Sequence, residues 1–355
     1  MGKIRLGILL NEVAGDEDMC VSACQELNEQ VEWDLIQFTD ANWLSQCKNK
    51  NFNGFIAIPG AYTTSFKNLY DERLYILNKT LGLPVFPSLN EVLIFENKKM
   101  LTYWMEAKNI PHPKTWIFYH KKEALNFITT ASFPIVAKTS IGAAGSGIIF
   151  LKNKKDAEHY ILESFSGSGI TRKTGPHLWK KGFLKRAAKK LVNPKEIKLK
   201  LFKYKIIKSD VQKSFVLFQE FINHDFEWRC VRIGDSFFAH KKLKLHNKTS
   251  GSLLKGYEKP PESLLNFVKK ITDENNFLSQ AVDIFEVGED VYLVNEMQCI
   301  FGQSDPYQML IDGVPGRYVC TNSKWIFEAG DFARNECFSL RLEVFVDILK
   351  KQLNL

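Results

Sequence analysis

The sequence has none of the features that mark a membrane-spanning or secreted protein. No apolar run approaches the ~20 residues that a helix needs to cross a bilayer. The first residues, Met1-Gly2-Lys3-Ile4-Arg5, do not have the layout of a signal peptide. The 7 cysteines are an odd number and include no Cys-x-x-Cys pair, so no disulfide framework is indicated. We therefore expect a cytoplasmic protein.

The glycine-rich stretch Ser140–Gly147 lacks the context of the common phosphate-binding loops. A P-loop needs Gly-Lys-Ser/Thr at the start of a helix, and a Rossmann turn also leads into a helix. Here the apolar run Phe133–Lys138 precedes the glycines, and a second apolar run, Ile148–Leu151, follows them. The pattern predicts two strands joined by a small-residue loop. Such a loop can close its backbone N–H groups over phosphates, with Lys138 pointing at them, although an ordinary hairpin turn would have the same pattern.

A second stretch, Val282–Gln298, predicts a β-hairpin with oxygen-bearing side chains. Two apolar runs are joined by a short turn that contains Gly288. Side chains alternate along a strand, so Glu296 and Gln298 share one face, and Asp283 can lie across from them. Two carboxylates and an amide oxygen suit Mg²⁺, with Mn²⁺ as an alternative ion. Because such a site is incomplete without phosphate oxygens, the hairpin predicts that a nucleotide binds here.

The order of these parts along the chain is more specific than any one part. After Lys138 and the glycine-rich stretch come the apolar segment Val216–Ile222 and then Glu227-Trp228-Arg229, before the hairpin. This order resembles the ATP-grasp superfamily, which includes D-alanine–D-alanine ligase, glutathione synthetase and the ribosomal-protein glutamate ligases. The resemblance covers roughly residues 91–302. It implies an α/β (α+β) ATP-grasp fold that follows an N-terminal parallel α/β domain.

The resemblance implies that Lys98 binds the nucleotide phosphates, with the adjacent Lys99 as the alternative. Where the family pattern has an aspartate and a glycine in this region, the chain has Asn97 and Asn109. The expected ATP-binding residues are Lys98, Lys138, Ser140, Gly142, Ala143, Gly145, Ser146, Gly147, Gln219, Glu220, Phe221, Ile222 and Glu227.

The resemblance also implies how the nucleoside is held. Backbone groups of Glu220 and Ile222 would bind the edge of adenine, with apolar neighbours stacked on it. Glu227 would accept hydrogen bonds from the ribose hydroxyls, with Asp225 as the competing candidate.

The expected catalytic residues are Arg229, Lys242 and Lys255. Arg229 can reach a phosphate or acyl-phosphate oxygen from the strand face that it shares with Glu227. Relatives place an arginine and an asparagine on the transferred phosphate and metal, where this chain offers lysines and Ser252 instead. In the strand predicted to bind the metal, the family has asparagine at the position of Gln298. Glutamine keeps the amide oxygen but on a side chain that is longer by one methylene group.

Length and patterning predict two or three domains, since 355 residues exceed what one hydrophobic core usually serves. Strand-like runs alternate with helical patterns up to about residue 86, which predicts a parallel α/β domain. A single helix is expected over Leu89–Asn109, with Ser88 as its N-cap, and a closing helix over Leu340–Leu353. The expected units are residues 1–95 (N-terminal α/β domain), 96–218 (central subdomain with the glycine flap) and 219–355 (C-terminal subdomain with the metal site).

Residues 171–213 form a basic insertion. They contain 15 Lys and Arg against only Glu196 and Asp210, a net charge of +13 in a chain of net charge +8. A helical pattern over Leu178–Val192 carries apolar residues among these lysines. A basic amphipathic helix is typical of contact with an anionic substrate or a membrane surface. Nucleic acid is less favoured because few aromatic residues are interleaved, and a solvated insertion without a partner is the leading alternative.

Together these features predict an ATP- and Mg²⁺-dependent ligase that joins a carboxylate to an amine through an acyl phosphate. Positioning and charge carry such chemistry, and the sequence shows no general-base dyad. The alternatives are a kinase that phosphorylates a small acceptor and a non-catalytic scaffold that binds through its basic insertion. Asp305 or Tyr307, and Tyr62 or Thr63 in the first domain, are candidates to touch the acceptor. A homodimer, common in that superfamily, is the alternative to a monomer.

Overall fold

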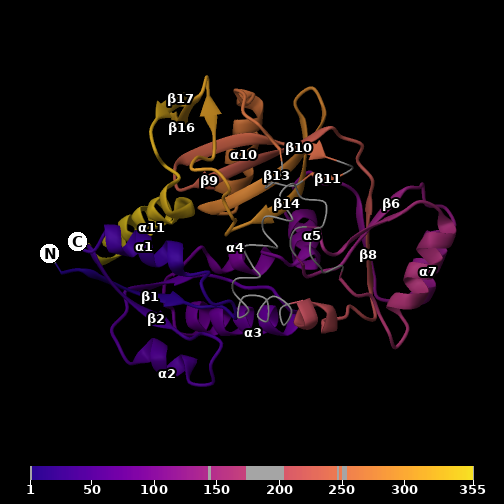
Figure 1. Cartoon of the computed structure of the whole chain (residues 1–355), viewed down its shortest axis with the longest axis horizontal. Helices are drawn as coiled ribbons and strands as arrows, with labels where there is room; N and C mark the ends of the chain where they lie inside the picture. The colour runs from indigo at the N-terminus through magenta and orange to yellow at the C-terminus, as the bar shows by residue number, and fades with distance from the viewer. Residues whose placement is uncertain (1, 143–144, 173–203, 246–247, 250–253, 355) are drawn as a thin grey trace, which may run out of the picture.

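The computed structural model describes residues 2–142, 145–172, 204–245, 248–249 and 254–354. Figure 1 shows three parts: an N-terminal unit drawn in indigo, a middle unit drawn in magenta, and a larger sheet drawn in orange. Among the helices of the described segments, none combines the length and the apolar character that a membrane crossing requires.

The N-terminal unit is built on a four-stranded parallel sheet. Its elements are β1 (Ile4–Leu9), α1 (Asp18–Glu26), β2 (Val31–Ile36), α2 (Trp43–Lys48), β3 (Gly54–Ala57), α3 (Thr64–Tyr75), a π-helical turn (Ile76–Thr80), β4 (Val85–Phe86) and α4 (Leu89–Ile94). The strands lie in the order β2-β1-β3-β4 and all pairs are parallel. Helices connect them, as parallel pairing requires. The predicted parallel α/β fold of this region is confirmed.

The last helix of the chain, α11 (Phe338–Leu353), completes the core of the N-terminal unit. It packs against α1 and β1, and Figure 1 shows it (yellow) beside α1. Phe345 on this helix is 2% exposed, and its ring lies 5.5 Å from that of Phe86 in β4. A Cβ atom on Gly54 would come within 2.6 Å of the Phe345 ring, so the glycine permits this close approach. The helix therefore packs with the first predicted unit although its sequence lies in the third.

The expected single helix over Leu89–Asn109 is wrong, because the structure has two helices there. α4 is followed by α5 (Lys98–Ala107), and Ser88 caps α4 as predicted. Between them Glu96 adopts a left-handed conformation with φ of +50°, and the side chain of Asn97 caps α5. A capping side chain offers the backbone an alternative to the continuing helix. The break places Lys98 in the first turn of α5.

The middle unit is built on a four-stranded antiparallel sheet. Its elements are β5 (Thr115–Phe118), α6 (Lys121–Phe127), β6 (Ile135–Lys138), β7 (Ile148–Leu151), α7 (Lys154–Ser164) and β8 (Val216–Glu220). The strand order is β5-β8-β6-β7, and β6 pairs with β7 antiparallel. The glycine-rich stretch therefore joins two strands, as predicted. The helix expected over Leu178–Val192 lies outside the described residues.

The largest sheet carries the predicted metal hairpin. Its elements are β9 (Phe226–Ile233), β10 (Ser236–Leu245), β11 (Lys248–Thr249), β12 (Lys255–Gly256), α10 (Glu262–Glu274), β13 (Ser279–Gly288), β14 (Val291–Gln298), β15 (Leu310–Ile311), β16 (Val314–Thr321) and β17 (Lys324–Ala329). Its main path is β14-β13-β9-β10-β16-β15. β13 and β14 are antiparallel with Asp283 opposite Glu296, which confirms the hairpin. A register shift beside this pair leaves Asn295 without an opposite residue, as in a β-bulge.

We expect Phe345→Ala to lower the free energy of unfolding by about 3–5 kcal/mol, because it would leave a cavity between α11 and the N-terminal sheet. Urea denaturation of the full chain measures this change. Leu353→Ala in the same helix is the control, since Leu353 is 43% exposed and surface substitutions usually change stability by less than about 0.5 kcal/mol. Equal effects of the two substitutions would contradict the packing described for α11.

Candidate functional site

The buried carboxylate of Asp283 lies at the centre of the site. Arg229, opposite it on β9, donates from Nε to Oδ1 at 2.8 Å and from Nη2 to Oδ2 at 2.9 Å. Lys242 on β10 donates from Nζ to the same Oδ2 at 2.7 Å and to Oε2 of Glu227 at 2.6 Å. Asp283 is 2% exposed and Lys242 is 5% exposed. The register of β13, β9 and β10 thus joins these four side chains in one network, which we call the Asp283 network.

The charges of the Asp283 network balance one another. Burial alone would raise the pKa of Asp283, but the charges and hydrogen bonds of Arg229 and Lys242 hold it well below its ordinary value. Two carboxylates, those of Asp283 and Glu227, thus face two cations. Because this network is neutral overall, the charge of a triphosphate has to be met largely by cations outside it.

The three predicted metal ligands lie on the hairpin next to this network. Glu296 is opposite Asp283, and Oε1 of Gln298 lies 3.4 Å from Nη2 of Arg229. Both oxygens of Asp283 already accept hydrogen bonds from cations. Across the described segments, no group of three or more His, Cys, Asp or Glu side chains could hold a metal ion. Metal binding by Asp283, Glu296 and Gln298 stays a prediction.

Glu96 is a carboxylate of the site that the sequence did not reveal. It is 6% exposed, and its Oε1 accepts a hydrogen bond from Nε2 of Gln298 at 2.9 Å. Its Oε2 lies 4.0 Å from Nζ of Lys98 and has no hydrogen-bond partner within the described part of the chain. Burial raises the pKa of Glu96, and the charge of Lys98 opposes this rise. The sequence pattern predicted a continuous helix through Glu96 and therefore did not indicate that Glu96 belongs to the site. The break between α4 and α5 places it there.

Lys138, at the end of β6, reaches across to the hairpin. Its Nζ donates to Oδ1 of Asn295 at 3.1 Å, and Nδ2 of Asn295 lies 3.5 Å from Oε1 of Glu227. Asn295 therefore links Lys138 to the Asp283 network. Sequence alternation missed it because it is the extra residue of the bulge. Lys138 is 8% exposed, and burial, together with the charge of Lys98, lowers its pKa to about 8.

Lys98 lies against the glycine-rich turn. Its Nζ donates to the carbonyl oxygen of Gly142 at 2.7 Å, and its backbone N–H donates to that of Ser140 at 2.9 Å. The alternative, Lys99, donates instead to the hydroxyl of Tyr119 at 2.9 Å. The structure thus brings both Lys98 and Lys138 to the start of this turn, while Lys99 points elsewhere.

Two glycines of this turn occupy positions that a larger residue could not take unchanged. Gly142 has a φ of +139°, a backbone conformation that residues with a side chain rarely adopt. A Cβ atom on Gly147 would lie 1.7 Å from Oγ1 of Thr139. Ala143 lies outside the described residues. Phosphate binding by Ser140, Gly142, Gly145, Ser146 and Gly147 stays a prediction.

The predicted adenine segment spans the end of β8 and the two residues after it. The backbone N–H of Glu220 donates to the carbonyl of Lys114 at 2.9 Å, and Oε1 of Glu220 accepts from the N–H of Lys114 at 2.7 Å. The carbonyl oxygen of Ile222 lies 2.9 Å from Nδ1 of His224. Adenine binding by Glu220 and Ile222 stays a prediction and would need backbone groups other than these.

The neighbours of Glu220 differ in what they contact. Gln219 is 6% exposed and its Nε2 donates to the hydroxyl of Thr115 at 3.2 Å, within the sheet. Phe221 contacts Phe150 of β7 edge to face, with ring centroids 6.0 Å apart. Contact of Gln219 or Phe221 with a nucleotide stays a prediction.

Lys255 has different hydrogen-bond partners from the other two expected catalytic residues, Arg229 and Lys242. It is opposite Lys242 in the pairing of β12 with β10, but its Nζ donates to Oδ2 of Asp305 at 2.6 Å. The hydroxyl of Tyr257 donates to the same oxygen at 3.0 Å. Arg229 and Lys242 thus belong to the Asp283 network, whereas Lys255 binds the loop after β14. Ser252 lies outside the described residues.

Arg172 ties the glycine-rich turn to the N-terminal unit. It donates to the carbonyl oxygen of Tyr62 and, at 2.8 Å, to Oδ2 of Asp210, which also accepts from the N–H of Thr64 at 3.1 Å. A Cβ atom on Gly142 would lie 2.9 Å from Cδ of Arg172. Arg172 could not be singled out by sequence pattern, because it is one of 15 cations in the insertion.

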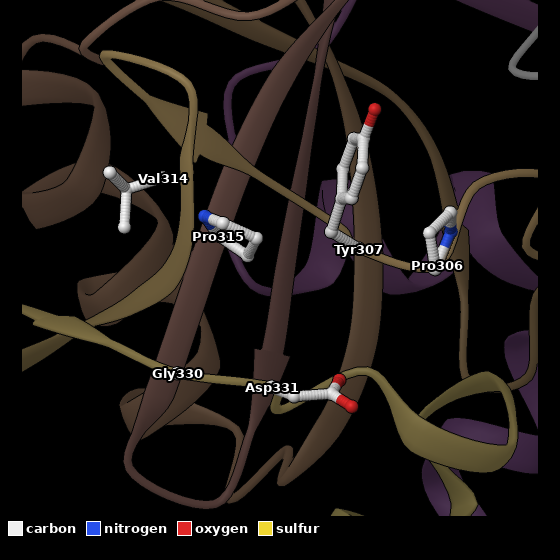
Figure 2. A pocket seen from close by; sticks show the side chains of 6 residues that line it. All are labelled: Pro306, Tyr307, Val314, Pro315, Gly330 and Asp331. Carbon is white, nitrogen blue, oxygen red and sulfur yellow. The ribbon is translucent and has the colours of Figure 1, made fainter.

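A cavity of about 280 Å³ lies outside this site (Figure 2). Its lining residues are Pro306, Tyr307, Val314, Pro315, Gly330 and Asp331. In Figure 2 the hydroxyl of Tyr307 points away from Asp331. The lining contains none of the expected ATP-binding, metal or catalytic residues, so this cavity is distinct from the candidate nucleotide site.

Comparisons with known proteins bear on the fold. No family model matches the sequence. The α-aminoadipate–LysW ligase LysX of Saccharolobus solfataricus is 33% identical over 69 residues, which make up 19% of this chain and 25% of that protein. The match therefore spans about a quarter of that relative's length.

Solved structures match over far more of the chain. An ATP-grasp RimK domain protein from Sphaerobacter thermophilus has a TM-score of 0.51 at 16% identity, over 82% of this chain and 90% of that one. D-alanine–D-alanine ligase from Bacillus anthracis has a TM-score of 0.51 at 12% identity, over 98% and 99%. The chain has the ATP-grasp fold. N5-carboxyaminoimidazole synthetase from Staphylococcus aureus, complexed with ADP, is also similar, with a TM-score of 0.52 at 12% identity over 84% and 71%. In this ATP-grasp fold the Asp283 network lies on the large sheet, and the glycine-rich turn on the middle unit.

We expect Lys242→Met to lower the free energy of unfolding by about 3–5 kcal/mol, because breaking a buried ion pair leaves uncompensated charge. Urea denaturation measures the loss. Arg5→Met is the control, since its pair with Glu32 at 2.8 Å is exposed and such pairs contribute about 1 kcal/mol or less. A loss no larger than that of the control would show that the Asp283 network is not buried as described.

Proposed function

We propose that this protein is an ATP- and Mg²⁺-dependent ligase that joins a carboxylate to an amine through an acyl phosphate. The observation that carries this proposal is the convergence of Lys98 and Lys138, at the glycine-rich turn, with the Asp283 network of the large sheet. Two of the similar proteins are named as ligases, which supports the same class of reaction.

The residues around the turn supply what a triphosphate needs. Because the Asp283 network is neutral, Lys98 and Lys138 provide the positive charge that phosphate oxygens require. Asp283, Glu296 and Gln298 would hold Mg²⁺, which would supply positive charge against the phosphates when bound. These side chains fit that ion chemically, since all of them bind through oxygen.

In the first step an oxygen of the substrate carboxylate attacks the γ-phosphorus, and the bond from that phosphorus to ADP breaks. In the second step the amine attacks the carbonyl carbon of the acyl phosphate, and inorganic phosphate leaves. Arg229 uses Nε and Nη2 to hold Asp283. We therefore propose that Nη1 of Arg229 stabilises the oxyanion of the tetrahedral intermediate.

The partners and location also remain proposals. The basic insertion, residues 171–213, would face an anionic substrate or a membrane surface because of its charge. The carboxylate and the amine would be small molecules, and the protein would work in the cytoplasm, as a monomer or a homodimer.

We expect ADP to form from ATP and Mg²⁺ only when a carboxylate and an amine are both supplied. Pools of carboxylic acids and amines, tested with a coupled assay for ADP, measure this dependence. Lys138→Met should reduce ADP formation at least about a hundredfold, because it removes a buried charge from the phosphates. Lys99→Met is the matched control and should retain activity, since Lys99 points toward Tyr119.

ADP formation that needs one acceptor and no amine would contradict the ligase and indicate a kinase. Failure of ATP to bind, measured by a thermal shift with Mg²⁺, would contradict both and indicate a scaffold.

We expect the affinity for ATP to fall as the pH rises above about 8, by up to about tenfold per pH unit. Lys138 has a pKa lowered to about 8, and phosphates beside it would raise that pKa. Binding therefore takes up a proton near and above pH 8. Calorimetric titration in two buffers of different ionisation enthalpy measures the uptake, and Lys138→Met should abolish it. An affinity that is constant from about pH 7 to about pH 9.5 would contradict the placement of Lys138 on the phosphates.

A further inference from the structure

A row of polar side chains continues across the large sheet beyond the Asp283 network. Directly opposite residues of antiparallel strands share one face of a sheet. Asp283 is opposite Arg229, and Arg229 is opposite His240 on β10. In the next row Lys242 is opposite Lys255 on β12. The face that holds Asp283 therefore runs on without interruption to His240 and Lys255.

His240 presents an unused hydrogen-bond acceptor in this row. It is 2% exposed, and its Nδ1 lies 2.8 Å from the carbonyl oxygen of Gln308. Because a carbonyl can only accept, Nδ1 carries the hydrogen of this bond. Burial, together with the charges of Lys255 and Arg229, lowers the pKa of His240 to about 3, so the ring is neutral and its Nε2 is an acceptor. Within the described segments Nε2 has no hydrogen-bond partner.

A buried polar atom without a partner is costly, which indicates that a donor reaches Nε2 in some state of the protein. The residues around His240 indicate what kind of molecule carries this donor. The ring of Tyr257 lies 5.8 Å from that of His240, and Tyr257 and Lys255 both donate to Oδ2 of Asp305. An ammonium and a hydroxyl thus hold one carboxylate beside the imidazole.

Asp305 is a carboxylate that another molecule could replace. Its side chain is 37% exposed and lies in the loop after β14, whereas the side chain of Lys255 is only 10% exposed. The partly buried cation is fixed to the sheet by β12, and the carboxylate comes from a surface loop. The next two residues, Pro306 and Tyr307, line the cavity of about 280 Å³ (Figure 2), although Lys255 and Asp305 themselves are not part of its lining.

We propose that Lys255, Tyr257 and His240 bind the amine substrate, and that this amine carries its own carboxylate. The carboxylate of the ligand replaces Asp305 on Lys255 and Tyr257, and an N–H group of the ligand donates to Nε2 of His240. Asp305 occupies the carboxylate position when the subsite is empty. The assignment rests on the ligase function proposed above, and it identifies the acceptor class as amino acids or peptides.

The test measures binding to the full chain, with and without ADP and Mg²⁺. The probes are glycine, which has both groups, acetate, which has only the carboxylate, and methylamine, which has only the amine. Asp305→Asn keeps the shape of the side chain and removes its charge. We expect this variant to bind glycine about tenfold more tightly than the unaltered protein, by saturation-transfer NMR titration. Asp305→Ala, a second variant, should show the same gain.

Two further variants assign the contacts. Adding Lys255→Met to Asp305→Asn should remove the gain for glycine. Adding His240→Asn instead, which keeps a group near Nδ1 and removes Nε2, should abolish the preference for glycine over acetate. The matched control is Glu258→Gln, which alters the 2.8 Å ion pair with Lys241 on the opposite side of β10 and should leave glycine binding unchanged.

Unchanged glycine binding in both Asp305 variants would overturn the proposal, as would a gain that survives Lys255→Met. A gain for acetate as large as that for glycine would overturn the amine contact. Binding of ADP, measured on the same samples, tests the nucleotide site separately. Loss of ADP binding with a gain for glycine would contradict the ligase but not the subsite, and the reverse result would contradict only the subsite.

Discussion

The placement of one buried negative charge, on Asp283, constrains the whole of the large sheet. A carboxylate removed from water is stable only where cations and hydrogen bonds replace its hydration. Arg229 and Lys242 supply these from two different strands. Because side chains alternate along a strand, a slip of one residue in β9 or β10 would turn these cations to the opposite face. The charge therefore fixes the register of three strands, and with it the direction in which Glu227 and His240 face.

The same constraint explains why the site is shared between units. A neutral network on the sheet leaves the charge of a polyphosphate to Lys98 on α5 and Lys138 on β6, which belong to other parts of the chain. The bond from Lys138 to Asn295 and the bond from Gln298 to Glu96 join these parts at the site. The candidate site thus exists only when the three units are in contact, and Arg172 adds a further tie from the N-terminal unit to the glycine-rich turn.

Local patterns were sufficient for some elements and insufficient for others. Alternating and β-branched residues predicted the hairpin of β13 and β14 and the strands on either side of the glycine-rich turn. The helical pattern over Leu89–Asn109 continues through Glu96, so the break there was not predictable from periodicity. Asn295 reaches the site through a bulge, and Asp305 reaches Lys255 across 50 residues of chain. Such contacts depend on tertiary packing, which the sequence does not display locally.

The position of α11 has a consequence for biosynthesis. Residues 4–9 form a central strand of the first sheet, yet residues 338–353 supply part of the cover on one of its faces. A ribosome makes α11 long after β1, so an apolar surface stays uncovered in the interval. Until α11 has left the exit tunnel, the face of the N-terminal sheet that it covers is therefore open to other apolar surfaces.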